Sequence, residues 1–275
     1  MTTAPTLAIV LVSYNAREDL FRCLASLHSH PPAASHEIIL VDNASTDEGL
    51  GVVRDRWPRV RIIENAENLG FARANNIGIR ASTSELILLL NTDTIVPAGA
   101  IDQLIAALRA HPDAAVAGPR LVDGAGQPEL SFGRMMGPLN ELRQKLLVRG
   151  HARGWPIVSA RVDRLTRQPR LTDWVSGACL LVRRGDAEPA GLLDERYFMY
   201  CEDVDFCAAI RARGRAILFT PDAEVIHLRG RSGADAPGAT QAAYRRAHLA
   251  FYEKHHPRWA PVLRWYLAAR GIKTA

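Results

Sequence analysis

Residues 85–93 read ELILLLNTD, and this stretch decides the fold. The apolar run from Leu86 to Leu90 is typical of a strand that is buried on both faces of a sheet, and it ends directly in the polar triplet NTD. A second stretch, EIILVDN at residues 37–43, has the same form. Short apolar strands that alternate with helical patterns predict an α/β fold with a mostly parallel central sheet.

The pattern extends over the first 120 residues. Strands are predicted at residues 7–13, 37–42, 60–64, 85–91 and 114–118, and helices at 18–28, 47–55, 72–81 and 98–110. Residues 120–170 are interpreted as an excursion with mobile loops and a helix at 139–148. Regular secondary structure is predicted again after residue 170: a strand at 173–183, a helix at 203–213, short strands at 216–219 and 224–228, and a helical tail from residue 241.

Composition indicates a globular protein of ordinary type. The 275 residues are 48% hydrophobic and 23% charged, enough to bury a sizeable core. The four cysteines form no CxxC pair, which favours neither a disulfide framework nor a zinc site and fits a reducing compartment. No signal-peptide pattern is found, and no apolar run has the roughly 20 residues of a membrane span. A cytoplasmic location is expected.

The net charge of +5 is compatible with nucleic acid, an anionic membrane face or a phosphate-bearing substrate. Zinc-finger spacing and an aromatic RNA-binding strand are both missing from the sequence, so a nucleic-acid partner is not expected.

Polar residues follow the predicted strands where ligands bind in an open α/β sheet, outside the carboxyl ends. Ser13-Tyr14-Asn15 ends the first strand, Asp42 the second, and Asn91-Thr92-Asp93 the fourth. Any one of these residues can be explained as a helix cap or turn residue. Two acids that each directly follow an apolar strand favour a binding site.

The chemistry of this pocket is constrained by missing motifs. The sequence lacks a GxGxxG after the first strand and a GxxxxGK[ST] anywhere, so neither a dinucleotide fingerprint nor a P-loop is present. A nucleotide can still be held if Asp42 accepts from a base or ribose hydroxyl while Mg²⁺ or Mn²⁺ at Asp93 neutralises a diphosphate. His227 is a candidate second metal ligand, although a lone histidine is more often structural.

A second acidic group lies at Glu202-Asp203-x-Asp205, after the aromatic stretch YFMY. Acids in the first turn of a helix are favoured by the helix dipole, so a structural reading stays open. Crowded carboxylates in a cleft can also raise one another's pKa, which suits a general base.

Seven motifs in this order resemble glycosyltransferase family 2, the inverting enzymes of GT-A fold, and within it the bacterial rhamnosyltransferase branch. They are VSYN (12–15), VDNASTD (41–47), NLGFARANNIGI (68–79), LLLNTD (88–93), SGACLLVRR (176–184), YFMYCEDVDFC (197–207) and VIH (225–227). The resemblance implies a GT-A, Rossmann-like catalytic domain over residues 1–230, with a nucleotide-binding half at 1–118 and an acceptor-side half at 119–230. Residues 231–275 would form a helical C-terminal tail.

The resemblance also assigns roles to single positions. Asp203 matches the catalytic base, with Glu202 beside it, and Asp93 with His227 matches the metal site. Asn91 replaces the first acid of the family's DxD motif, which leaves Asp93 with most of the charged coordination. The resemblance implies that the nucleotide-sugar site is lined by Ser13, Tyr14, Asn15, Asp42, Asn68, Gly70, Phe71, Asn75, Asn91, Thr92, Asp93, Gly177 and Ala178.

The implied reaction is inverting transfer from a nucleoside-diphosphate sugar to a glycan or polyprenyl-linked glycan in bacterial cell-wall or polysaccharide synthesis. Deoxythymidine-diphosphate rhamnose is the first candidate donor, on resemblance alone. Trp259, Trp265 and Tyr266 lie among arginines, Arg270 included, so the tail is also a candidate peripheral contact with the inner membrane face. A non-catalytic scaffold and a sugar nucleotidyltransferase remain alternative functions. A homodimer is a candidate assembly.

Overall fold

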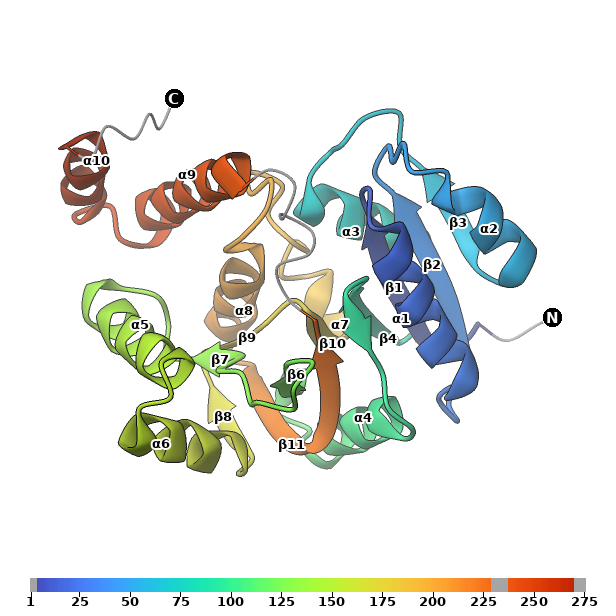
Figure 1. Cartoon of the computed structure of the whole chain (residues 1–275), viewed down its shortest axis with the longest axis horizontal. Helices are drawn as coiled ribbons and strands as arrows, with labels where there is room; N and C mark the ends of the chain where they lie inside the picture. Colours follow the sequence, from blue (N-terminus) through green and yellow to red (C-terminus); the bar gives the residue numbers. More distant parts are fainter. Residues whose placement is uncertain (1–3, 229–236, 270–275) are drawn as a thin grey trace.

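The computed structural model describes residues 4–228 and 237–269, in which a central sheet is covered by helices (Figure 1). The strands of the sheet are β1 (Leu7–Ser13), β2 (His36–Asp42), β3 (Arg61–Glu64), β4 (Leu86–Asn91), β5 (Thr94–Ile95), β6 (Ala114–Val122), β8 (Arg170–Thr172), β10 (Cys179–Arg183) and β11 (Ala216–His227). A small second sheet pairs β7 (Phe132–Gly133) with β9 (Trp174–Val175). The helices are α1 (Arg17–Ser29), α2 (Gly49–Arg56), α3 (Phe71–Arg80), α4 (Ala100–Ala110), α5 (Pro138–Ala152), α6 (Pro156–Thr166), α7 (Arg184–Ala187), α8 (Glu202–Ala212), α9 (Pro237–His255) and α10 (Ala260–Ala269).

The central sheet has the order β3-β2-β1-β4-β10-β6-β11-β5, with β8 paired to β11. Its first four strands run parallel, as do β6 and β11, while β10 is antiparallel to both of its neighbours. In this register Ser13 lies opposite Asp42, and Val12 lies opposite Asn91. The expected α/β sheet with flanking helices is confirmed, and the polar ends of β2, β1 and β4 meet at one edge.

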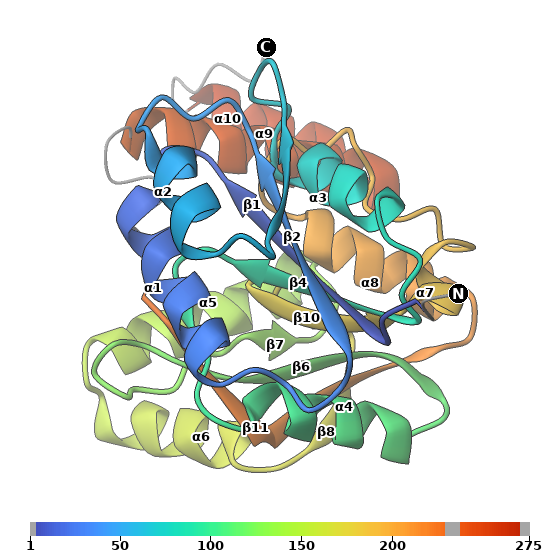
Figure 2. The same ribbon diagram turned by 90° about the vertical axis from the view of Figure 1, so that its right-hand side faces the viewer.

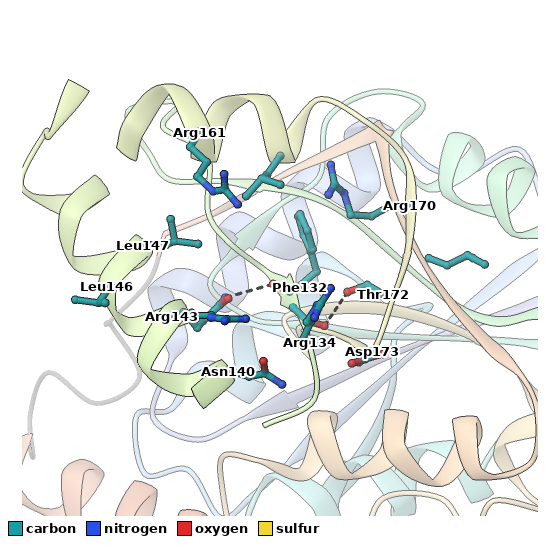
Figure 3. A pocket seen from close by; sticks show the side chains of 14 residues that line it. Phe132, Arg134, Asn140, Arg143, Leu146, Leu147, Arg161, Arg170, Thr172 and Asp173 are labelled. Atoms are coloured by element: carbon teal, nitrogen blue, oxygen red, sulfur yellow. Dashed lines mark hydrogen bonds between the residues drawn. The ribbon is translucent and has the colours of Figure 1, made fainter. Parts of the chain in front are cut away.

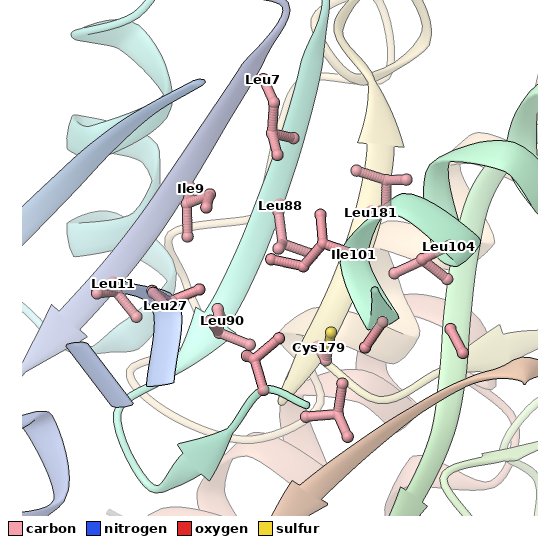
Figure 4. Close-up of a cluster of buried hydrophobic side chains, with 14 of the residues drawn as sticks. Leu7, Ile9, Leu11, Leu27, Leu88, Leu90, Ile101, Leu104, Cys179 and Leu181 are labelled. Carbon is pink, nitrogen blue, oxygen red and sulfur yellow. The ribbon is translucent and has the colours of Figure 1, made fainter. Parts of the chain in front are cut away.

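The core explains why the apolar strands have no polar face. Successive side chains of a strand point to opposite faces, so a strand covered by helices on both sides must be apolar throughout. One face of the sheet packs against α1, α2 and α4, and the other against α3, α7 and α8 (Figure 2). Figure 4 shows the first face at Leu7, Ile9, Leu11, Leu27, Leu88, Leu90, Ile101, Leu104, Cys179 and Leu181.

The segment 120–170 differs from the expected loop excursion. It contains two helices, of which α5 extends the predicted helix and α6 was not predicted. Each helix has proline at its first position, where the missing N–H costs nothing and the fixed φ favours a helix. Much of α5 and α6 is exposed, which accounts for their weak apolar periodicity.

Two strand predictions also need correction. Residues 173–183 form β9 and β10 rather than one strand, because Ser176, Gly177 and Ala178 leave the ladder between them. The two short strands predicted at 216–219 and 224–228 form a single strand, β11, whose register shifts between Thr220 and Glu224. Pro221 within this irregular stretch explains the prediction of a break.

The helix α9 packs against α5 through a buried carboxylate. The Glu141 carboxylate of α5 accepts hydrogen bonds from Tyr252 and His248 of α9 and from Lys145. Burial alone would raise the pKa of Glu141, but these donors lower it to about 2. The proposed domain boundary at 230/231 and Arg270 lie outside the described residues. Among the helices that the structure describes, none is long and apolar enough to cross a bilayer.

We expect this contact to weaken in acid. The folded-state pKa of Glu141 lies below its unfolded value, so the carboxylate stabilises the fold above pH about 4.5, and this contribution is lost as the pH falls toward 2. Glu141→Gln should lower the melting temperature at pH 7 by about 5 °C and flatten the fall in stability between pH 4.5 and 3. Thermal melts over that pH range test this. Glu253→Gln, which removes an exposed carboxylate paired with Arg264, is the control and should change little. An equal loss in both variants would contradict the assignment.

Candidate functional site

The carboxyl ends of β1, β2 and β4 hold three buried polar side chains. Ser13 and Asp42 are register partners, and Asp93 follows β4 by two residues. Each of the three is at most 4% exposed. The strand ends therefore bring together the acids that the sequence placed there.

Asn15 and Asp42 shape the loop after β2. The Asn15 side-chain oxygen accepts from the Thr46 N–H, the Asn15 N–H donates to the Ser45 hydroxyl, and one Asp42 oxygen accepts from the Ser45 N–H. Tyr14 and Asn15 are both exposed, but the Asn15 side-chain oxygen and N–H are engaged in holding the loop after β2. Tyr14, which is 48% exposed, remains available to a ligand.

Asn43, a polar residue at the end of the second strand to which the sequence analysis assigned no role, holds the next loop. Its side-chain nitrogen donates to the Asn68 side chain and the Gly70 carbonyl, and its side-chain oxygen accepts from Asn65 and the Leu69 N–H. The Asn68 oxygen also accepts from the Gly70 N–H. Asn68 therefore fixes the turn that precedes α3. Its position directly after Asp42 in the sequence was the only signal for Asn43.

The turn at Gly70 touches the segment that carries the acidic cluster. Gly70 has φ of +82°, and a Cβ there would come within 2.4 Å of the Phe198 carbonyl oxygen. The Phe71 N–H donates to that same carbonyl at 2.6 Å. Only glycine fits this position, because both the backbone conformation and the space exclude a side chain.

The acidic cluster begins after two unusual backbone positions. Tyr200 and Cys201 both have positive φ, 74° and 67°, and Glu202 starts α8 directly after them. The Asp203 carboxylate accepts from the N–H of Gly177 at 2.9 Å and from the N–H of Val204 at 2.8 Å. Since Asn91 donates its N–H to the Ala178 carbonyl, Asp203 is anchored next to the end of β4.

Burial raises the pKa of both carboxyl groups. For Glu202 the nearby Asp203 charge adds to the effect of burial. For Asp203 the effect of burial exceeds the opposing backbone hydrogen bonds from Gly177 and Val204. A carboxyl group with a raised pKa is a better proton acceptor than an exposed one, so the pair has the properties of a general base.

Asp93 lies against His227, as the sequence reasoning required. The His227 Nε2 is 3.4 Å from Asp93 Oδ1, and its Nδ1 is 3.3 Å from Glu129 Oε2. Burial would lower the pKa of His227, but the two carboxylates raise it to about 9. Sequence reasoning missed Glu129, which lies in the irregular stretch after β6 and carries no motif.

Several buried oxygens at this edge lack donors within the described part of the chain. They belong to Asp42 (Oδ1), Asn91 (Oδ1) and Glu202 (Oε2), while Asp93 Oδ1 has only the 3.4 Å contact with His227. Buried acceptors are normally satisfied, so a set of orphaned oxygens calls for hydroxyl donors or a cation from a ligand. Hard oxygen donors fit Mg²⁺ or Mn²⁺. No group of three or more His, Cys, Asp or Glu that could hold a metal alone occurs in residues 4–228 and 237–269, so substrate oxygens would have to complete the coordination.

The remaining residues with an assigned role are mostly backbone supports. Asn75 is buried in α3 and donates to the Phe71 carbonyl, while Thr92 and Ala178 are buried beside the end of β4. Gly177 leaves room for Asp203, whose Cβ would lie 3.2 Å from an added methyl group. These residues position the site, and their contact with a sugar nucleotide stays a prediction.

Residues 8–184 match the sequence pattern of glycosyl transferase family 2. The N-acetylglucosaminyl-diphospho-decaprenol L-rhamnosyltransferase of Mycobacterium tuberculosis is 32% identical, with 95% of this chain and 89% of that protein aligned. The chain belongs to glycosyl transferase family 2. It is a glycosyltransferase, as the resemblance of its motifs predicted. The low-salt glycan biosynthesis hexosyltransferase Agl10 of Haloferax volcanii is 25% identical, over 76% of this chain and 63% of that protein.

Solved structures confirm the GT-A fold of this family 2 member. A mannosyltransferase from Pyrobaculum calidifontis, in complex with GDP-mannose and Mn²⁺, superposes with a TM-score of 0.62 at 18% identity, covering 96% of this chain and 69% of the other. GalNAc-T7 with UDP, GalNAc and Mn²⁺ gives a TM-score of 0.60 at 18% identity, covering 82% of this chain and 43% of that chain. Within residues 237–269 the tail is helical as expected, with Trp259, Trp265 and Tyr266 exposed on or next to α10. Its membrane contact and a homodimer stay predictions.

The contact at Gly70 can be tested with two glycines of the same conformation. Gly70→Ala should lower the melting temperature and reduce turnover, because the added Cβ must displace the Phe198 segment that leads to Asp203. Gly126→Ala is the matched control, since Gly126 has φ of +77° with no atom within 4 Å of an added Cβ. The control carries the left-handed cost of about 1 kcal/mol without the collision. Equal melting temperatures and equal turnover for the two variants would show that the Phe198 contact contributes nothing.

Proposed function

We propose that the protein is a metal-dependent, inverting rhamnosyltransferase that uses deoxythymidine-diphosphate rhamnose and a polyprenyl-diphosphate-linked N-acetylglucosamine. The single observation behind the rhamnose and the acceptor is the alignment with the mycobacterial relative, which spans nearly the whole of both chains. The deoxythymidine diphosphate of the donor rests on the resemblance of the motifs alone. Because the similarity is not confined to the nucleotide-binding half, it includes the residues after β6 that would meet an acceptor. The product would serve cell-wall or polysaccharide synthesis.

The binding step is supported by the orphaned oxygens at the sheet edge. Asp42 would accept from a hydroxyl or base N–H of the nucleoside, and Tyr14 would lie along the base. Asp93 and His227 would hold Mg²⁺ or Mn²⁺, which stabilises the charge that develops on the departing nucleoside diphosphate. The Mn²⁺ in both structural neighbours favours a metal of this kind.

The chemical step would rest on Asp203. Its carboxylate is held by the Gly177 and Val204 N–H groups, so the side chain is fixed while further lone pairs remain for an acceptor hydroxyl. Asp203 would take the proton of this hydroxyl as its oxygen attacks the anomeric carbon from the face opposite the leaving group. A single displacement inverts the anomeric configuration. Glu202 is the competing candidate, because one of its buried oxygens has no donor among the described residues.

A non-catalytic scaffold is the alternative of another class. A scaffold needs neither a carboxylate positioned by two backbone N–H groups nor a buried acid beside it with a raised pKa. Burying such groups costs free energy, which favours a catalytic use. Hydrolysis of the sugar nucleotide by the purified protein, absent in a scaffold, separates the two.

Removing the base should affect turnover and leave donor binding intact. Asp203→Asn keeps the shape and should lower kcat by roughly 100-fold to 10,000-fold, with the donor dissociation constant unchanged. Because burial raises the pKa of Asp203, the wild-type rate should fall on the acid side at a higher pH than an exposed aspartate would give. Glu202→Gln is the comparison variant. A larger loss of kcat in Glu202→Gln than in Asp203→Asn would assign the base to Glu202 instead.

Removing the metal ligand should affect binding. Asp93→Ala should weaken Mn²⁺-dependent binding of deoxythymidine diphosphate by roughly tenfold or more, because the cation would lose the carboxylate ligand that follows β4. Calorimetric titration with Mn²⁺ and with EDTA gives this difference. Glu67→Gln is the control, since Glu67 is an exposed acid in the loop before Gly70. Wild-type affinity in Asp93→Ala would remove Asp93 from the metal site.

A further inference from the structure

A large cavity lies outside the site described above. It is enclosed by α5, α6, β7 and β8 and has a volume of about 1030 Å³ (Figure 3). None of the residues assigned to the nucleotide, the metal or the base lines it. Gln144 of α5 donates to the carbonyl groups of Leu130 and Phe132, so one wall is tied to β7.

The polar lining of the cavity is strongly cationic. Figure 3 shows Arg134, Arg143, Arg161 and Arg170 around the ring of Phe132. Within the described residues, no carboxylate lies within ion-pair distance of any of these four guanidinium groups. Arginines that crowd together without acids repel one another, and their forked N–H groups match phosphate oxygens.

Asp173 and the buried Nε of Arg170, both in the lining, also favour an anionic ligand. The Asp173 carboxylate is already engaged by Arg211 of α8 and by the Met135 N–H, so it does not neutralise the cluster. Arg170 stacks over Phe132, and its buried Nε has no hydrogen-bond partner in the part of the chain that is described. A buried donor without a partner calls for an acceptor. The cavity therefore fits a multiply charged anion.

The rest of the lining is apolar, which a free anion does not need. Leu146, Leu147, Leu165 and Leu171 complete the cavity wall, and Leu146 and Leu171 are 56% and 65% exposed. Further exposed apolar side chains lie near the starts of α5 and α6, at Leu139, Trp155 and Ile157. An apolar surface of this kind next to a cationic lining fits a ligand that joins a diphosphate to a hydrocarbon chain.

The cavity is connected through the fold to the proposed base. Phe132 of its lining pairs with Val175 of β9, and the segment that follows β9 contains Gly177, whose N–H donates to Asp203. Asp173 of the lining pairs with Arg211 of α8, the helix whose first turn contains Asp203. The cavity and the proposed base therefore contact the same two elements, β9 and α8.

We propose that this cavity binds the diphosphate and the first isoprenoid units of a lipid-diphosphate-linked acceptor, with the arginines on the phosphates and the leucines on the chain. This proposal rests on the glycosyl transfer proposed above. It deepens that function by assigning the acceptor a site of its own, separate from the nucleotide.

The charge is tested with two double variants on the same helices. Arg143→Gln/Arg161→Gln removes two guanidinium groups from the lining, and Arg149→Gln/Arg164→Gln removes two exposed ones from α5 and α6 outside it. Geranylgeranyl diphosphate is titrated into the full-length protein, with melting temperatures as the fold check. The first variant should bind roughly tenfold more weakly, and the second should bind like wild type. Equal weakening in both would reduce the effect to general surface charge and overturn the proposal.

The apolar part is tested with a matched pair on α5. Leu146 and Leu142 are each 56% exposed, and only Leu146 is part of the lining. Leu146→Ser should weaken geranylgeranyl diphosphate binding without changing inorganic pyrophosphate binding, and Leu142→Ser should change neither. If the wild-type protein binds pyrophosphate as tightly as geranylgeranyl diphosphate, the proposal that the leucines bind the isoprenoid chain is overturned. If all variants bind phosphatidylglycerol vesicles with the same affinity, the cavity is a discrete site for the lipid diphosphate. If the variants lose affinity for the vesicles and keep their affinity for geranylgeranyl diphosphate, the surface is a bilayer contact and the proposal is overturned.

Transfer assays separate this proposal from the proposed function. With N-acetylglucosaminyl-diphospho-geranylgeraniol as acceptor, Arg143→Gln/Arg161→Gln should raise the acceptor KM and leave kcat and the donor KM unchanged. With an octyl glycoside of the same sugar the variant should match wild type. If wild type transfers rhamnose and the variant shows no KM change, the cavity proposal fails alone. If wild type binds the lipid diphosphate but transfers nothing, the proposed function fails while the cavity assignment stands.

Discussion

The contact between the Gly70 turn and the Phe198 carbonyl joins the two parts of the site. The Phe71 N–H reaches across more than a hundred residues of sequence to bond this carbonyl, and the space allows no side chain at Gly70. On one side the Asn43 network holds the loops after β2 and β3. On the other side the chain turns into α8 and its carboxylates. The position of the strand ends of β1, β2 and β4 relative to the α8 carboxylates depends on this junction.

A second constraint is electrostatic. The sheet edge concentrates carboxylate and amide oxygens in a region with little water, and several of them lack a donor among the described residues. Such an arrangement opposes folding, since each buried acceptor loses its hydration without compensation. The proposed cation and sugar nucleotide would supply the missing partners, so part of the free-energy cost of burying these oxygens would be recovered on binding. Binding of this kind would account for the buried acids at this edge.

The sequence predicted the parts of the site that local chemistry determines. Asp42 and Asp93 were recognisable because a strand buried on both faces must be apolar, which makes an acid directly after it conspicuous. The pairing of Asp93 with His227 was also anticipated, and the structure brings the two to 3.4 Å. Glu129 could not be found in this way, since its place beside His227 depends on how the irregular stretch after β6 folds back. The helix α6 escaped prediction because its exposed surface leaves little apolar periodicity, although Pro156 marks its start.

Tyr200 and Cys201 have a consequence for how this enzyme can change over time. Two consecutive residues with side chains in the left-handed region store roughly 1–3 kcal/mol each, and surrounding contacts must enforce that conformation. Glycine at either position would relieve the tension, so selection for thermostability alone would drift toward it. The same exchange would give the backbone ahead of the carboxylates more conformational freedom. Glycine at these two positions would favour stability, whereas residues with side chains favour a fixed position for the carboxylates that follow. The presence of Tyr200 and Cys201 is consistent with the second effect.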